Sequence, residues 1–128
     1  MASEQLPITE QDILNQVTAL GGDVTPDVEM LAATAANRLR LHGVHRNADG
    51  RKVDEEQLKK AGAATKILET LQASTSALDQ RMQHAAEPEV VEAKKKVAAI
   101  RKMALAVKAA VSILLGNLDD PAINLVRG

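Results

Sequence analysis

Side chains that could bind a metal ion recur between residues 45 and 56, at the spacing of a calcium-binding loop. Such a loop takes oxygen ligands from its positions 1, 3, 5 and 12 and has glycine at position 6. Counted from His45, the matching residues are Asn47, Asp49, Gly50 and Glu56. Position 1 is His45 itself, whose ring nitrogen suits the hard Ca²⁺ ion poorly. A divalent-metal-responsive loop is therefore the weakest of the functions that we consider.

The same stretch is also typical of a turn that leads into a helix. "NADG" is a common turn sequence, and the acidic residues after it suit a helix N-terminus. Asp54 is placed as an N-cap with Gln57 three residues later, which is the spacing of a capping box. We favour this interpretation, so we expect neither a bound metal nor a cofactor.

A row of basic residues in the later segment "EAKKKVAAIRK" is a second candidate site. Residues seven apart share one face of a long helix, which groups Lys94, Arg101 and Lys108, with Lys95 and Lys102 beside them. Together these five residues form what we call the basic stripe. Such a stripe could contact the phosphates of a nucleic acid or an acidic partner protein.

The basic stripe has a structural explanation that we favour over nucleic-acid binding. Its residues could be solvated, or could pair with acids of the preceding helix such as Glu69 and Asp79. The chain carries a net charge of only -1 and contains no Phe, Tyr or Trp. Base-stacking platforms are therefore missing, and no overall charge attracts a nucleic acid.

The sequence contains no residue pattern that is typical of a catalytic site. The chain contains no cysteine, and we find no nucleophile–histidine–acid grouping or glycine-rich phosphate loop. The sequence therefore predicts a protein that is not an enzyme. The first residues lack the features of a secretory signal, and the longest apolar run, residues 103–115, is too short to cross a bilayer. We therefore expect an intracellular, cytoplasmic protein without membrane contacts.

Residues typical of helix starts and ends predict two short helices within residues 9–42, after a flexible N-terminus at residues 1–8. Thr9 is placed as the first N-cap, and the "GG" after Leu20 ends that helix. Thr25 caps the second helix, with Pro26 at its first position and Gly43 after its end.

A heptad pattern predicts a long antiparallel helical hairpin over residues 54–118. Its first helix runs from Asp54 to about Ala86 without a break, and "EP" after it forms the turn. We expect both heptad rows of the second helix to be buried and Lys108 to point outward. The apolar tail, residues 119–128, should dock on the bundle. Six members of the two rows carry this prediction, namely Val97, Ile100, Ala104, Val107, Val111 and Leu114.

The last long helix resembles the vinculin-binding helices of talin-type rods in its spacing of small and aliphatic residues. The resemblance covers about one helix, and Lys108 stands where that pattern has a small residue, so no partner is carried over. The residues concerned are Ile100, Met103, Ala104, Val107, Val111, Leu114, Leu115 and Leu118.

These observations predict one all-α domain over residues 1–128, a helical hairpin with two shorter N-terminal helices packed on it. The function that remains is protein–protein interaction or assembly through helix faces, with another protein or a second copy of the chain as partner. Nucleic-acid association through the basic stripe is the alternative, and the 45–56 loop is the weaker one.

Overall fold

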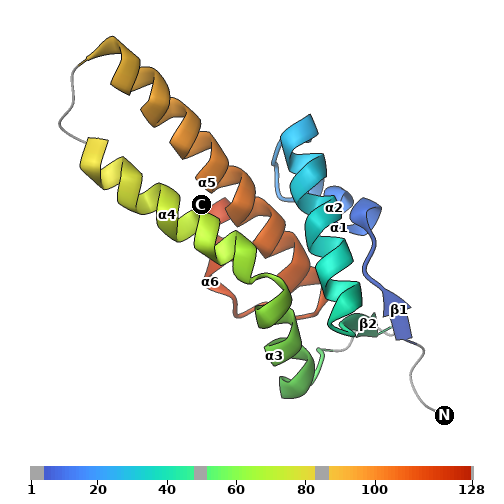
Figure 1. Ribbon diagram of the computed structural model, residues 1–128. Helices are drawn as coiled ribbons and strands as arrows, with labels where there is room; N and C mark the ends of the chain where they lie inside the picture. The colour runs from blue at the N-terminus through green and yellow to red at the C-terminus, as the bar shows by residue number, and fades with distance from the viewer. Residues whose placement is uncertain (1–4, 48–51, 83–86, 128) are drawn as a thin grey trace.

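The computed structural model describes residues 5–47, 52–82 and 87–127. This part of the chain forms six helices and one two-stranded sheet, so the expected all-α class is confirmed (Figure 1). The elements in chain order are β1 (Gln5–Pro7), α1 (Glu10–Ala19), α2 (Pro26–Leu41), β2 (His45–Asn47), α3 (Glu55–Ala64), α4 (Lys66–Met82), α5 (Pro88–Leu114) and α6 (Pro121–Arg127).

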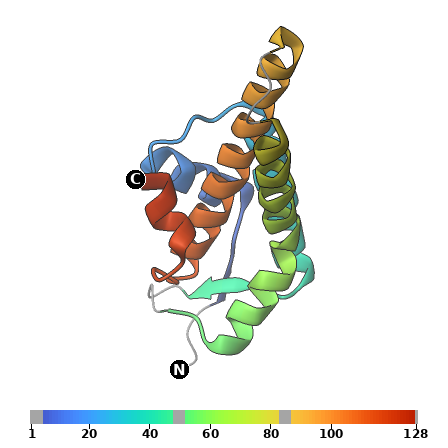
Figure 2. The same ribbon diagram turned by 90° about the vertical axis from the view of Figure 1, so that its left-hand side faces the viewer.

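The second half of α5 is the centre of the molecule. Residues on all sides of this half are buried, from Ala104 to Ser112, because neighbours surround it. Helices α1 and α2, the antiparallel helix α4 and the terminal helix α6 all contact α5, and Figures 1 and 2 show them around its lower part. A helix enclosed in this way needs apolar residues on every face, which the sequence provides here.

The two N-terminal helices begin and end where the sequence predicts. The hydroxyl of Thr9 accepts from the amide of Asp12 while the Asp12 carboxylate accepts from the Thr9 amide, which completes a capping box. Thr25 caps α2 in the same manner through the amide of Val28. The buried stripe of α2 is formed by Val28, Ala32, Ala35 and Leu39.

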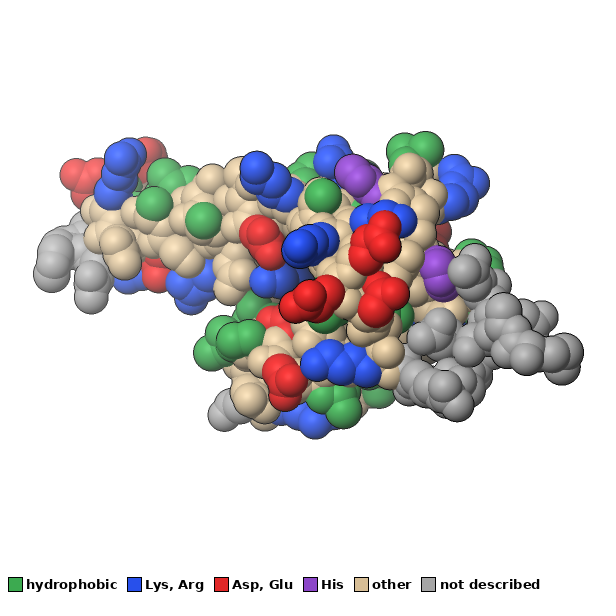
Figure 3. All heavy atoms as spheres, turned by 90° about the horizontal axis from the view of Figure 1, so that it is seen from below, with side chains coloured by type: hydrophobic (Ala, Val, Ile, Leu, Met, Phe, Trp, Pro, Cys, Tyr) green, Lys and Arg blue, Asp and Glu red, His purple; other side chains and the backbone are tan. Residues whose placement is uncertain are grey.

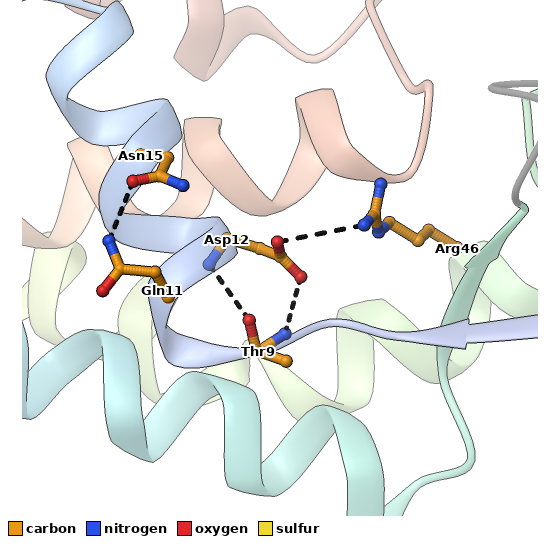
Figure 4. A network of polar contacts seen from close by, with 5 residues as sticks. All are labelled: Thr9, Gln11, Asp12, Asn15 and Arg46. Atoms are coloured by element: carbon orange, nitrogen blue, oxygen red, sulfur yellow. Dashed lines mark hydrogen bonds and ion pairs between the residues drawn. The ribbon is translucent and has the colours of Figure 1, made fainter.

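Residues 5–8 differ from the expected flexible N-terminus. Strand β1 pairs antiparallel with β2, with Leu6 opposite Arg46, and Ile8 is buried in the core. Arg46 then reaches Asp12 at 3.8 Å, as Figure 4 shows. The pairing joins the start of the chain to the segment after α2, and local sequence does not reveal such a tertiary contact.

The predicted long first helix of the hairpin is broken at Thr65, so that α3 and α4 are separate. The hydroxyl of buried Thr65 donates to the carbonyl of Ala61 at 2.8 Å. Directly after it, the amide of Leu68 donates to the Thr65 carbonyl at 2.9 Å, three residues earlier, which is a 3₁₀-type bond that interrupts the regular α-helix. The hairpin itself is therefore formed by α4 and α5, while α3 lies below it (Figure 1).

The second helix of the hairpin ends at Leu114, four residues earlier than predicted. Gly116 has φ +73°, and the amide of Asn117 donates to the carbonyl of Ser112 at 2.8 Å. This is a Schellman ending, in which the glycine adopts a left-handed conformation. The following tail docks as expected, because α6 buries Ala122 and Ile123 against α1 and α5.

Candidate protein-interaction face on the distal hairpin

The end of the hairpin extends beyond the rest of the molecule (Figures 1 and 2). We call residues 71–82 of α4 and 88–102 of α5 the distal hairpin. Its only buried side chain among the described residues is Thr75, whereas the next residues of α5 become buried from Ala104 onward. The distal hairpin is therefore a pair of helices without a third element to cover their seam.

This arrangement corrects the prediction that both heptad rows of α5 are buried. Val107 and Val111 are buried as predicted, but Val97 is only half-buried and Ile100 is 38% exposed. The heptad pattern continues along α5, whereas the helices that would cover it end near Met103. An apolar pattern identifies the face of a helix and does not specify how many neighbours cover that face.

Ion pairs occupy much of the basic stripe. Arg101 Nη1 lies 3.6 Å from Asp79 Oδ2 on α4, and Lys108 Nζ lies 3.2 Å from Glu69 Oε1. Both pairings are those that the structural interpretation of the stripe named. A third pair joins Lys95 to an acid of its own helix, Glu92, at 3.7 Å.

The remaining two residues of the stripe lie apart from each other. Lys94 is half-buried, while Lys102 is exposed and lines a hollow between α5 and the loop after α1. The five basic residues therefore do not form one continuous free surface. The space-filling view from below likewise shows Lys and Arg interspersed with Asp and Glu (Figure 3).

The pair Arg101–Asp79 also fixes which residues face each other across the hairpin. Leu78 directly precedes Asp79, and Ile100 directly precedes Arg101. One residue corresponds to about 100° of rotation around a helix axis. Because the two helices are antiparallel, these rotations turn both apolar side chains toward the same side of the hairpin. Leu78 and Ile100 therefore lie at one level of the hairpin, on the side away from the ion pairs.

This side of the hairpin carries an apolar face that we define by Leu71, Leu78, Ala93 and Ile100, with Met82 at its end. Leu71 and Leu78 are seven residues apart, as are Ala93 and Ile100, so each pair shares one helix face. Leu78 is 41% exposed and Ile100 38% exposed. Of these residues, Ile100 was expected to be buried, and its exposure was missed.

The body covers the same side of the hairpin only as far as Met103. The Thr25 hydroxyl, at the start of α2, lies 3.9 Å from Met103 Sδ, and both Ile67 and Met103 pack against the core. Ile100, three residues before Met103 on α5, is the first large apolar residue beyond this cover. The apolar face is therefore a continuation of the core surface onto an uncovered part of the hairpin.

The 45–56 loop can be followed only in part, because residues 48–51, including Asp49 and Gly50, lie outside the described residues. Asp54 accepts from the amide of Gln57 at 2.9 Å as the N-cap of α3, as predicted. Glu56 lies within α3 and forms an ion pair with Lys60 at 3.6 Å. Within the described residues no three His, Asp or Glu side chains come together as a metal site.

A polar hollow of about 360 Å³ lies at the base of the hairpin between α3, α5 and the start of α6. The ion pair of Lys108 with Glu69 lies at its edge. Ser112 donates to Asp120, and the same carboxylate caps α6 through the amide of Ala122. Because its polar groups already bind one another, we attribute this cluster to the attachment of α6.

None of the helices in the described ranges is long and apolar enough to span a membrane. Comparisons with protein-family models, with curated proteins and with solved structures found no significant match for this chain.

Proposed function

We propose that the chain is a non-enzymatic protein-interaction module, and that the apolar face of the distal hairpin receives a helix of a partner chain. The observation that carries the proposal is the exposure of Leu78 and Ile100 on the two hairpin helices, beyond the start of α2 at Met103. Apolar grooves between helices commonly receive an amphipathic partner helix. Here the exposed apolar residues of the two hairpin helices, Leu78 and Ile100, would contact such a helix.

The energetics favour a partner on this face. About two fifths of the Leu78 and Ile100 side chains remain in water, and burying that remainder would contribute roughly 1 kcal/mol for each residue. The half-buried residues Leu71, Ala93 and Val97 would add to this gain. Charged groups on the other side of the hairpin, by contrast, already form ion pairs with each other.

The alternative functions receive less support. Three of the five basic residues lie within 4 Å of a carboxylate, which lowers the attraction for phosphates. In the 45–56 loop, Asp54 serves as a helix cap and Glu56 pairs with Lys60. Glu56, which takes position 12 of the loop, would have to leave Lys60 in order to bind a divalent cation.

Site-specific photo-crosslinking tests the proposal. A photoreactive amino acid replaces Ile100 in one variant and exposed Gln80, which lies outside the apolar face, in a matched control variant. Each full chain is irradiated in extract of the cells that express it. We expect adducts with a protein chain from position 100 and few from position 80.

Equal yields from the two positions would contradict the proposal, and so would the absence of a protein adduct from position 100. The mass of the adduct distinguishes a second copy of this chain from a different protein. Circular dichroism at 222 nm verifies that each variant is folded.

A further inference from the structure

We infer that the partner on the apolar face is a second copy of this chain, packed antiparallel so that each distal hairpin covers the other. The inference rests on the function proposed above and names its partner. Face-to-face packing of two helical hairpins forms a four-helix bundle, in which each apolar seam is enclosed. The distal hairpin has two of the four helices that such a bundle needs.

The position of α2 favours the antiparallel orientation. Helix α2 begins beside Met103 and occupies the side of the hairpin that carries the apolar face. Two copies with parallel hairpins would bring their α2 helices together at the same level. In the antiparallel orientation, the α2 helices of the two copies lie at opposite ends of the contact.

The charges on α5 of one copy attract those on α5 of the other copy only when the two helices are antiparallel. Acidic residues stand at its start, and basic residues follow them. Glu89 and Lys96, both exposed, are seven residues apart and so share one face beside Ala93 and Ile100. An antiparallel neighbour brings Glu89 of each copy beside Lys96 of the other, whereas a parallel neighbour brings like charges together.

The size of the face sets the expected strength of the association. The uncovered part of α5 from Pro88 to Arg101 is about 21 Å long, and two helices side by side are roughly 20 Å wide. The contact therefore covers about 400 Å² of footprint on each copy, roughly 800 Å² in total, which is the size of a weak, transient contact. We therefore expect a reversible dimer that forms only at high concentration, with a dissociation constant on the order of 10⁻⁴ M.

Sedimentation equilibrium of the full chain between about 20 µM and 1 mM at low salt tests the inference. Interference optics are required because the chain has no aromatic residue. We expect the mass to rise from 13.6 kDa toward twice that value. Glu89→Lys and Lys96→Glu should each weaken the association about tenfold, because each places two like-charge pairs in the symmetric contact.

Charge restoration provides the matched control. An equimolar mixture of the two single variants, and also the doubly substituted chain, should associate as strongly as the original because every pair is again attractive. A chain that stays monomeric at 1 mM would overturn the inference, and so would single variants that associate normally or a mixture that associates no better than either variant alone. If the chain is monomeric but position 100 crosslinks a different protein, the second-copy partner is wrong and the proposed function stands.

Discussion

Asp79 and Arg101 face each other across the hairpin at 3.6 Å, and this pair sets the register of α4 against α5. One residue earlier on each helix, Leu78 and Ile100 lie side by side on the opposite side and stay about 40% exposed. The hairpin thus has one side with interhelical ion pairs and one apolar side. The apolar side carries the proposed function.

Val107 is the residue whose polar replacement should damage the fold most clearly. Its side chain is fully buried in the central half of α5. Val107→Asp would bury an unpaired carboxylate at a cost of several kcal/mol. A domain of this size has only about 5–15 kcal/mol of stability. We expect an unfolded protein, or a melting temperature lowered by roughly ten degrees or more, as measured by circular dichroism at 222 nm.

Lys108→Gln is the matched control for this variant, one residue along the same helix. It removes the ion pair with Glu69 but buries no charge, so a loss of roughly 1 kcal/mol or less is expected. If the two variants melt alike, the assignment of the buried face of α5 is wrong.

Two glycines with open surroundings should respond in opposite directions to replacement by alanine. A Cβ at either Gly43 or Gly62 meets nothing within 4 Å, but only Gly43 has a positive φ, of +73°. Gly43→Ala should therefore destabilise the protein by about 1 kcal/mol. Gly62→Ala, inside α3, should stabilise it by a similar amount. Urea unfolding of both variants measures the difference, and shifts of equal sign would contradict the assigned backbone conformations.

The capping box of α1 gives a third prediction. Thr9→Ala removes the acceptor for the Asp12 amide and should cost about 1 kcal/mol of unfolding free energy. Thr34, whose hydroxyl donates to the Met30 carbonyl within α2, is the control. Thr34→Ala should be neutral or slightly stabilising, because alanine has the higher helix propensity. A larger loss at position 34 than at position 9 would argue against the cap.

Nucleic-acid binding should be weak even at low salt. The ion pairs of Lys95, Arg101 and Lys108 and the net charge of -1 leave little attraction for phosphates. We expect little retention of duplex DNA in a gel shift at low ionic strength. Strong retention that falls steeply with salt and is lost in the Lys94→Glu, Arg101→Glu double variant would instead favour the basic stripe as a phosphate site.

Local signals in the sequence were sufficient for most helix boundaries. Thr9, Thr25 and Asp54 were each identified as N-caps because a cap acts on amides two or three residues away. The break at Thr65 was missed because threonine is also found inside regular helices, and its back-bond to Ala61 is a feature of the folded chain. The pairing of β1 with β2 was missed because it depends on residues about 40 positions apart.

The candidate site was predicted in part. The heptad rows located the apolar residues, and Glu69 and Asp79 were expected as acids that could pair with the basic stripe, which they do through Lys108 and Arg101. The heptad pattern does not indicate how many helices surround each segment. Ile100 and Val107 belong to one heptad row, yet one is exposed and the other buried, because α2 begins beside Met103, between their levels.

A methyl NMR titration of the full chain tests the central claim most directly. The chain has six isoleucines, so selective labelling yields six δ1 methyl signals, including that of Ile100 on the apolar face and that of fully buried Ile13. As the concentration rises from about 20 µM to 1 mM, near the expected dissociation constant, we predict that the Ile100 signal moves progressively while the Ile13 signal does not. An Ile100 signal that stays fixed, while that of Ile123 on α6 or another isoleucine moves, would place the contact elsewhere and contradict the account.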